Sequence, residues 1–167
     1  MPKDTIISIC PLILLNICEN TGVKCTQNNQ KNAEKYAVKN MRKKDMTKAC
    51  AVFEKLLAWQ KDKNVGPKEL STTLNNLGMV YKNAGKFEKS EENFRLAIEQ
   101  ANHGYGEGNV FLATMWNNLG QVHRAQKKHA ESVPCYRRAQ GIRENSVGKD
   151  HASLCIDYIG LARATRD

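Results

Sequence analysis

A five-residue phrase occurs twice in this chain, at an interval of 42 residues. Leu-Asn-Asn-Leu-Gly occupies residues 74–78, and Trp-Asn-Asn-Leu-Gly occupies residues 116–120. A fixed period of this length is typical of chains built from stacked structural repeats, in which each repeat buries its apolar face against its neighbours. The phrase therefore limits the chain to a small set of repeat architectures.

Around the phrase, the repeats align in columns that hold apolar or small residues. The middle repeat has Leu74, Leu77, Gly78, Tyr81, Ser90, Phe94 and Ala97, and the next repeat has Trp116, Leu119, Gly120, His123, Ser132, Tyr136 and Ala139. Upstream the columns hold Ala33, Tyr36, Ala37, Asn40, Ala49, Phe53 and Leu56, and downstream Tyr158, Leu161, Ala162 and Thr165 begin a further repeat. Spacings of three and four place the first columns on one helical face. We therefore expect an all-α chain in which small residues let the paired helices pack closely around the aromatic column.

The order of these columns resembles the tetratricopeptide repeat family, in which a large residue, Leu-Gly and Tyr precede small, aromatic and Ala positions. The period exceeds the family's usual length of about 34 residues. The loop at residues 142–151 and Pro134 are most similar to the repeats of kinesin light chains. The resemblance covers residues 31–167 and implies a right-handed superhelix (an α-solenoid) of about 3.5 helix-turn-helix repeats. The chain lacks the coiled-coil heptads of kinesin light chains and has fewer repeats, so we do not expect a motor subunit.

The predicted domain organisation has two parts. Residues 1–30 form an N-terminal segment, either a degenerate capping helix or a disordered stretch. Residues 31–167 form the repeat domain, with repeats at about 31–66, 67–107, 108–149 and a partial one at 150–167. The apolar run at residues 6–18 is interrupted by Pro11 and is too short to span a bilayer, so no transmembrane span is predicted.

The chain has a net charge of +9, and the first helix of each repeat carries asparagines, lysines and arginines. Together these features indicate a binding surface. In such superhelices the first helices line the concave groove, where stacked asparagines can donate to and accept from the main chain of an extended peptide. Lysines and arginines on the same face favour an acidic peptide. The resemblance supports this interpretation, because related repeats hold peptides with residues at these positions. The predicted peptide-binding residues are Asn75, Asn76, Lys82, Asn83, Asn117, Asn118, Gln121, Arg124, Lys35, Arg42 and Arg163.

The predicted function is therefore a non-enzymatic scaffold or adaptor that binds a partner protein through an acidic peptide segment. The six cysteines and four histidines show no catalytic or metal-finger spacing, so we expect no enzyme, no cofactor and no metal site. The cysteine pattern also favours reduced thiols in the cytoplasm.

Two alternatives remain. A basic helical-repeat chain can bind RNA, although the groove lacks repeated aromatics for base stacking, and we do not expect nucleic acid to be the ligand. The chain could also act as an assembly factor that docks through the ends of its solenoid, including self-association through an uncapped C-terminal end.

Overall fold

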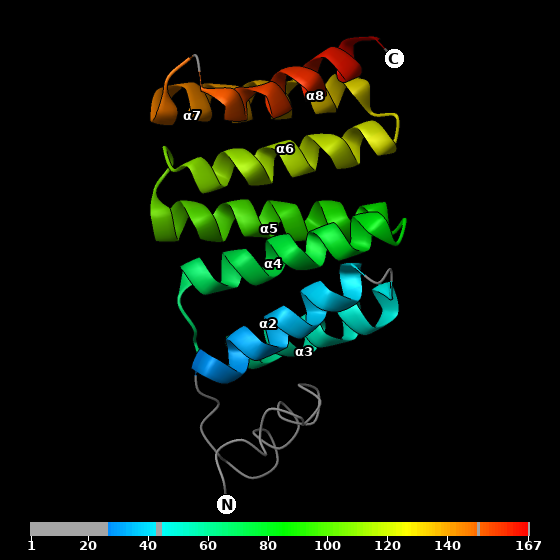
Figure 1. The fold of residues 1–167 in the computed structure, drawn as a ribbon, viewed down its shortest axis with the longest axis vertical. Helices are drawn as coiled ribbons and strands as arrows, with labels where there is room; N and C mark the ends of the chain where they lie inside the picture. The colour runs from blue at the N-terminus through cyan, green and yellow to red at the C-terminus, as the bar shows by residue number, and fades with distance from the viewer. Residues whose placement is uncertain (1–26, 43–44, 150, 167) are drawn as a thin grey trace, which may run out of the picture. The chain divides into compact units, whose positions relative to one another are not determined.

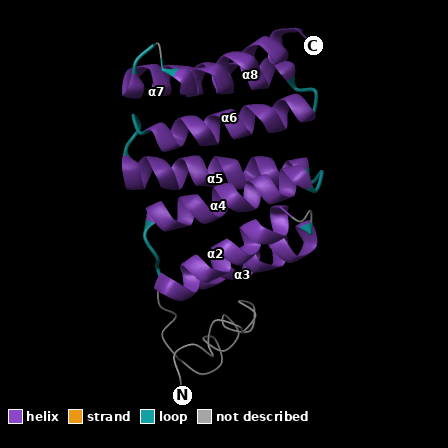
Figure 2. Ribbon diagram, viewed as in Figure 1, coloured by secondary structure: helices purple, strands orange, loops and turns teal. Residues whose placement is uncertain are grey.

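Helices make up nearly all of the described part of the chain, which is residues 27–42, 45–149 and 151–166 of a computed structural model (Figures 1 and 2). The helices are α2 (Gln27–Arg42), α3 (Met46–Asp62), α4 (Pro67–Asn83), α5 (Phe87–Tyr105), α6 (Val110–Ala125), α7 (His129–Val147) and α8 (Cys155–Arg166), with a short 3₁₀ helix, η2, at Ala152–Leu154. No strand occurs within these residues. The predicted all-α fold of helix-turn-helix repeats is confirmed.

The chain divides into two compact units, Met1–Val65 and Gly66–Asp167. Most of the predicted N-terminal segment, residues 1–26, lies outside the described residues. The boundaries predicted for that segment and for the repeats therefore stay predictions.

Unit 1 contains the pair α2 and α3. Ala33 and Ala37 of α2 and Ala49 of α3 are all fully buried, so the two backbones can approach closely. Asp45 precedes α3 and caps its N-terminus, since its side chain accepts a hydrogen bond from the Lys48 amide. Phe53 completes the core of this pair and is also fully buried.

Unit 2 contains the pairs α4–α5 and α6–α7, followed by α8, and these helices stack in chain order (Figure 1). The 42-residue period is visible in the backbone as well as in the side chains. Gly106 and Gly148 end α5 and α7 with φ values of 84° and 89°, which favour glycine. Within each pair, Gly85 and Lys127 occupy equivalent turn positions with φ values of 73° and 62°.

Glycines in the first helix of each pair admit aromatic rings from the second helix. A Cβ atom at Gly78 would lie 2.9 Å from Cε1 of Phe94, and one at Gly120 would lie 3.0 Å from Cε1 of Tyr136. Both rings are almost completely buried. Ser90 Oγ also donates a hydrogen bond of 2.7 Å to the Gly78 carbonyl. The close packing predicted for these columns is therefore present in both pairs.

None of the described helices combines the length and the apolar character that a bilayer crossing requires.

Candidate functional site

The first helices of the two pairs, α4 and α6, are joined by side-chain hydrogen bonds. Asn118 Nδ2 donates to Asn75 Oδ1 at 3.1 Å, and Lys82 Nζ donates to Gln121 Oε1 at 2.7 Å. Lys82 is half-buried, and its burial together with the positive charge of Arg124 lowers its pKa. We call the contact between one first helix and the next a step of the stack. Because both bonds cross from α4 to α6, we name this contact the bridged step.

The next step, from α6 to α8, carries different residues at the equivalent positions. The equivalents of Asn118 and Asn75 are Gly160 and Asn117, 42 residues later, so one partner of the bond has no side chain. The equivalents of Lys82 and Gln121 are two arginines, which repel each other.

Neither of the two bridging bonds can form between α6 and α8, and this step opens into a cleft of about 350 Å³, which we name the α6–α8 cleft. Its lining residues are Asn117, Gln121, Arg124, Tyr136, Ile156, Ile159, Gly160 and Arg163.

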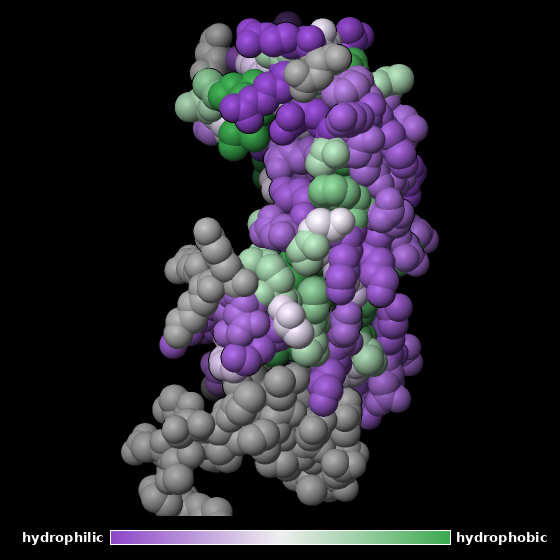
Figure 3. Space-filling view, turned by 90° about the vertical axis from the view of Figure 1, so that its right-hand side faces the viewer, coloured by the Kyte–Doolittle hydropathy of each residue, from purple (hydrophilic) through white to green (hydrophobic). Residues whose placement is uncertain are grey.

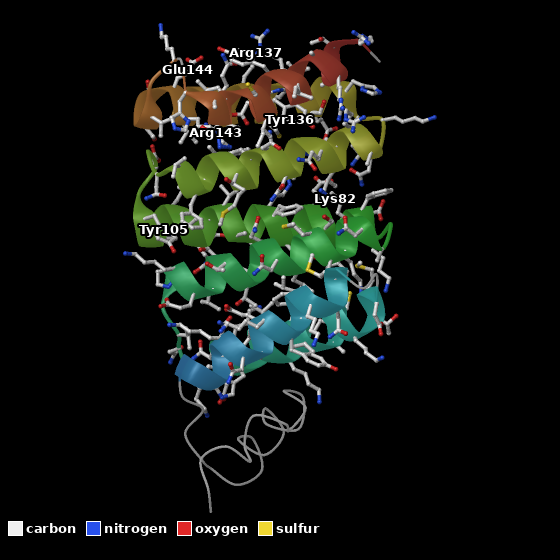
Figure 4. The ribbon with its side chains drawn as sticks, in the orientation of Figure 1. Lys82, Tyr105, Tyr136, Arg137, Arg143 and Glu144 are labelled. Atoms are coloured by element: carbon white, nitrogen blue, oxygen red, sulfur yellow. The ribbon has the colours of Figure 1, made fainter. Side chains whose placement is uncertain are left out.

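The Tyr136 ring is wedged between α6 and α8 beside the cleft. A Cβ atom at Gly160 would lie 2.6 Å from Cδ1 of Tyr136, so only glycine fits at this position without a shift. Tyr136 and Arg137 leave α7 on opposite sides, and Arg137 is exposed (Figure 4). Burial raises the pKa of the Tyr136 hydroxyl, although the hydrogen bond and charge of Arg124 act in the opposite direction. The phenol is therefore neutral at physiological pH, and it contributes a polar edge to the cleft.

A buried ion pair holds α8 in place behind the cleft. Arg143 Nε of α7 lies 2.9 Å from Asp157 Oδ2 of α8, and the two residues are only 5% and 1% exposed. Asn117 Nδ2 donates to the other oxygen of Asp157 at 2.9 Å, and Asn117 Oδ1 accepts from Gln121 Nε2 at 2.7 Å. Burial raises the pKa of Asp157, against the opposing effects of Asn117 and Arg143.

The hydrogen bonds form one chain through unit 2. It runs from Lys82 through Gln121 and Asn117 to Asp157 and Arg143, and so links α4, α6, α8 and α7. Such a network orients the amides at the cleft, because each amide has its donor and acceptor groups assigned by its neighbours.

The structure divides the predicted site residues into three groups. Four of them line the α6–α8 cleft, namely Asn117, Gln121, Arg124 and Arg163. Five lie on or against the bridged step, namely Asn75, Asn118, Lys82, the half-buried Asn76 and the exposed Asn83 at the end of α4. The other two belong to unit 1, where Lys35 is exposed on α2 and Arg42 ends that helix. Ligand binding by all eleven stays a prediction.

Sequence reasoning missed the cleft residues Tyr136, Ile156 and Gly160 and the ion pair behind them. A signal for the ion pair was present in the alignment of the repeats. Arg143 and Asp157 stand where the preceding repeat has Ala101 and Met115, so two charges occupy apolar columns. A charge in a buried column needs a partner of opposite sign, and Arg143 and Asp157 supply one for each other.

Hydrophobic side chains of α8 are exposed next to the cleft. Ile156, Tyr158 and Ile159 are 56%, 47% and 51% exposed. In the space-filling view, hydrophobic residues gather at the end of unit 2 formed by α7 and α8 (Figure 3). The α6–α8 cleft thus combines two arginines, two amides and an apolar rim.

Comparisons with known proteins agree with the observed architecture. Two family models described as tetratricopeptide repeat match residues 111–167 and 71–103. No curated protein matches the chain.

Several solved structures have a similar fold. BtubC (BKLC) from P. vanneervenii has a TM-score of 0.80 and 24% identity, and the match covers 93% of this chain and 63% of that one. The chain therefore spans less than two thirds of the length of BtubC. The TPR-like repeats of a candidate kinesin light chain from Podosopora anserina have a TM-score of 0.72 and 14% identity, with coverages of 93% and 76%. The Sgt2 TPR domain from Aspergillus fumigatus has a TM-score of 0.61 and 17% identity, with coverages of 84% and 79%. At these identities the likeness concerns the fold alone.

Proposed function

Because the chain belongs to the tetratricopeptide repeat family, we propose that it is a non-enzymatic scaffold whose α6–α8 cleft binds an extended, acidic peptide segment of a partner protein. Repeats of this kind present extended surfaces to other macromolecules.

The pair Arg124 and Arg163 carries this proposal. Their equivalents in the preceding step, Lys82 and Gln121, hydrogen-bond to each other, whereas two arginines cannot. A carboxylate placed between them relieves their repulsion and accepts charge-assisted hydrogen bonds from both guanidinium groups. An Asp or Glu side chain of the ligand is therefore the complement of this position.

The other lining residues define the rest of the peptide. The amides of Asn117 and Gln121 line the cleft but are hydrogen-bonded to Asp157, to each other and to Lys82, so they fix the shape of the cleft. Ile156 and Ile159 form an apolar rim. A volume of about 350 Å³ accommodates one or two side chains, not a folded domain. The favoured ligand is thus an acidic residue next to an aliphatic one within an extended segment.

Residues of the bridged step extend the proposal along unit 2. Asn75 and Asn118 already bond to each other, so a peptide main chain reaching them exchanges hydrogen bonds with an existing pair. Asn76 and Asn83 lie on the same helix as Asn75 and continue the proposed path. Lys35 and Arg42 belong to unit 1 and stay in the proposal on the strength of the repeat columns alone.

A peptide-binding assay tests the cleft directly. We compare the full chain with an Arg124→Gln/Arg163→Gln variant by fluorescence anisotropy, using labelled decapeptide pools of Asp, Glu and aliphatic residues. The cleft variant should bind about tenfold more weakly, because it loses charge-assisted hydrogen bonds. The matched control is Arg137→Gln/Lys149→Gln, which removes the same charge at exposed positions outside the cleft and should change affinity by about twofold or less.

Three results would count against the proposal. Equal losses in both double variants would mean that net charge alone attracts the peptides. Undiminished binding of pools with Asn and Gln in place of Asp and Glu would exclude acidic recognition. Preferential binding of mixed-sequence RNA, weakening steeply between about 50 and about 200 mM salt, would favour the nucleic-acid alternative.

We also propose that the exposed face of α8 supports self-association with a second copy of the chain. Tyr158 and Ile159 are both about half exposed on α8 and offer apolar surface that a second copy can cover. Sedimentation velocity at increasing concentration should show dimers that disappear in a Tyr158→Lys variant. A monomeric wild-type chain at high concentration would refute this second proposal without affecting the peptide site.

A cytoplasmic location is part of the same proposal. Cys135 and Cys155 are free thiols, which suits a reducing compartment. Microscopy of the tagged full chain tests this location, and accumulation in a secretory compartment would contradict it.

A further inference from the structure

One column of the repeat changes its chemistry between the two pairs of unit 2. In α4 it holds Tyr81, and Nζ of Lys89 from α5 lies 5.6 Å from the centre of the Tyr81 ring. In the next pair, 42 residues later, the same two positions hold His123 and Glu131. A cation beside an aromatic ring is thus replaced by a carboxylate beside an imidazole, and both members of the pair have changed.

The new pair lies against a second carboxylate. His123 Nδ1 lies 3.3 Å from Glu131 Oε2 and 3.9 Å from Glu91 Oε2. Three different helices supply these groups, α5, α6 and α7, and the three ligand atoms lie within 4.8 Å of one another. Two oxygens and one nitrogen therefore converge at one point between packed helices.

His123 points its ring nitrogen into this cluster without a hydrogen bond. The residue is 2% exposed, and its Nδ1 atom is buried with no hydrogen-bond partner. A buried polar atom normally finds a partner, because leaving it unsatisfied is destabilising. The orphaned nitrogen is therefore a second observation, independent of the carboxylates, that indicates a missing ligand.

We propose that Glu91, His123 and Glu131 form a binding site for a divalent transition metal ion, with Zn²⁺ as the favoured occupant. Atoms that each bind Zn²⁺ at about 2.0–2.2 Å are about 3–4 Å apart, which matches the separations from His123 Nδ1. One imidazole and two carboxylates suit zinc better than calcium or magnesium, which prefer oxygen ligands throughout.

The surrounding charges leave room for the ion. Arg95 bonds Glu91 through Oε1 at 2.9 Å, so Oε2 remains directed at His123. Lys128 Nζ lies 3.5 Å from that Oε2, but its side chain is 43% exposed and can withdraw into solvent when a dication enters.

Cys135 is buried one helical turn beyond Glu131 but is not assigned as a ligand. Its sulfur is not among the ligand atoms that lie within 4.8 Å of one another. The proposed ligand set therefore consists of nitrogen and oxygen atoms only, which gives the experiment a spectroscopic signature.

Metal titration of the reduced, chelator-dialysed full chain tests the site. We expect isothermal titration calorimetry to show about one Zn²⁺ per chain, and His123→Tyr to weaken binding by about tenfold or more. His123→Tyr restores the residue that packs in this column at Tyr81, and Glu131→Gln removes a ligand whose side chain is 54% exposed, so folding is preserved in at least the second variant. Circular dichroism checks each variant.

Matched controls separate this site from other metal-binding side chains. Glu92→Gln changes the exposed carboxylate next to Glu91, and His103→Ala removes an exposed histidine of α5; both should bind Zn²⁺ like the wild type. Titration with Co²⁺ should give weak visible bands and no intense thiolate charge-transfer band. The proposal is overturned if the wild type binds no Zn²⁺, if Glu131→Gln binds as tightly as the wild type, or if Co²⁺ reports cysteine ligands.

Discussion

Unit 2 contains two successive steps with the same arrangement of helices, but different side chains hold the helices together in each step. In the first step, from α4–α5 to α6, the buried positions hold Ala101 and Met115. In the second step, from α6–α7 to α8, the same columns hold the ion pair of Arg143 and Asp157. A period in the sequence thus preserves helix positions while the interactions between helices change from apolar packing to a directed polar contact.

The difference affects the groove side of each step as well. Lys82 bonds Gln121 in the first step, whereas Arg124 and Arg163 face the cleft in the second. Apolar packing tolerates small rotations of a helix, but a buried ion pair with an amide partner holds α8 in one orientation. The second step therefore has less freedom in its core and more open surface at its cleft.

The largest expected effect comes from breaking the ion pair on one side. Asp157→Met introduces the residue of the first step but leaves Arg143 buried without its carboxylate, which should lower the free energy of unfolding by about 3–5 kcal/mol. The Arg143→Ala/Asp157→Met double variant recreates the apolar pair and should recover most of that loss. Guanidinium unfolding of the full chain measures both values. A double variant no more stable than Asp157→Met would show that the two steps are not interchangeable.

A second, smaller effect should come from the glycines that contact Tyr136. Gly160→Ala should lower the free energy of unfolding by about 1–3 kcal/mol, and Gly120→Ala by less, because the ring is closer to Gly160. Gly141→Ala is the control, since a Cβ atom there meets nothing within 4 Å and alanine favours the helix. Thermal unfolding followed by circular dichroism ranks the three variants. Equal effects of Gly160→Ala and Gly141→Ala would remove the steric argument.

A third effect concerns the titration of Lys82 in the first step. Burial and the charge of Arg124 lower its pKa below the ordinary value of 10.5, so the protonated amine destabilises the fold. Stability relative to a Lys82→Met variant should therefore rise as the pH increases through the folded-state pKa towards 10.5, and stay level at neutral pH. NMR titration of the labelled Lys82 side chain should show it losing its proton below the ordinary pKa of 10.5. Titration of Lys82 at or above 10.5 would contradict this interpretation of the first step.

The smallest effect concerns the rate at which cysteines of the second step are chemically modified. This rate reports whether reagent reaches the contact between α7 and α8, and it does not depend on a change in stability. Cys135 is buried with a pKa raised to about 11, whereas Cys155 is exposed at the start of α8. At about pH 8, iodoacetamide should modify Cys135 at least tenfold more slowly than Cys155, because the thiolate is the reactive form. Peptide mapping by mass spectrometry follows both rates. Comparable rates would mean that α7 and α8 separate readily.

The sequence predicted the frame of unit 2 well, because its columns determine which residues are buried. Gly78 and Gly120 admit Phe94 and Tyr136 as their columns indicated. In α8, however, the small column residue Ala162 is exposed, and Gly160 approaches the Tyr136 ring. The columns describe how a first helix packs against the second helix of its own repeat, whereas Gly160 packs against α7, the second helix of the preceding repeat.

The candidate sites were predicted less completely, for a related reason. Arg124 and Arg163 both line the cleft, and each follows the large residue that begins the columns of its repeat, Trp116 or Tyr158. Ligand binding by them stays a prediction. The columns did not reveal that Asn118 bonds to Asn75, because the alignment of repeats gives the position of a residue on its helix but not the residue that it contacts. The cluster around His123 was also invisible, since its three members come from three helices and share no short spacing.

The exchange of Asn118 for Gly160 across one period has a consequence for how such chains diversify. Removing a bridging side chain such as that of Asn118 opens a step without changing the columns that hold the helices together. The reverse change is harder, because a side chain at Gly160 would meet the buried Tyr136 ring. Each period is in this sense a separate locus for acquiring a ligand, and duplication supplies further copies on which selection can act.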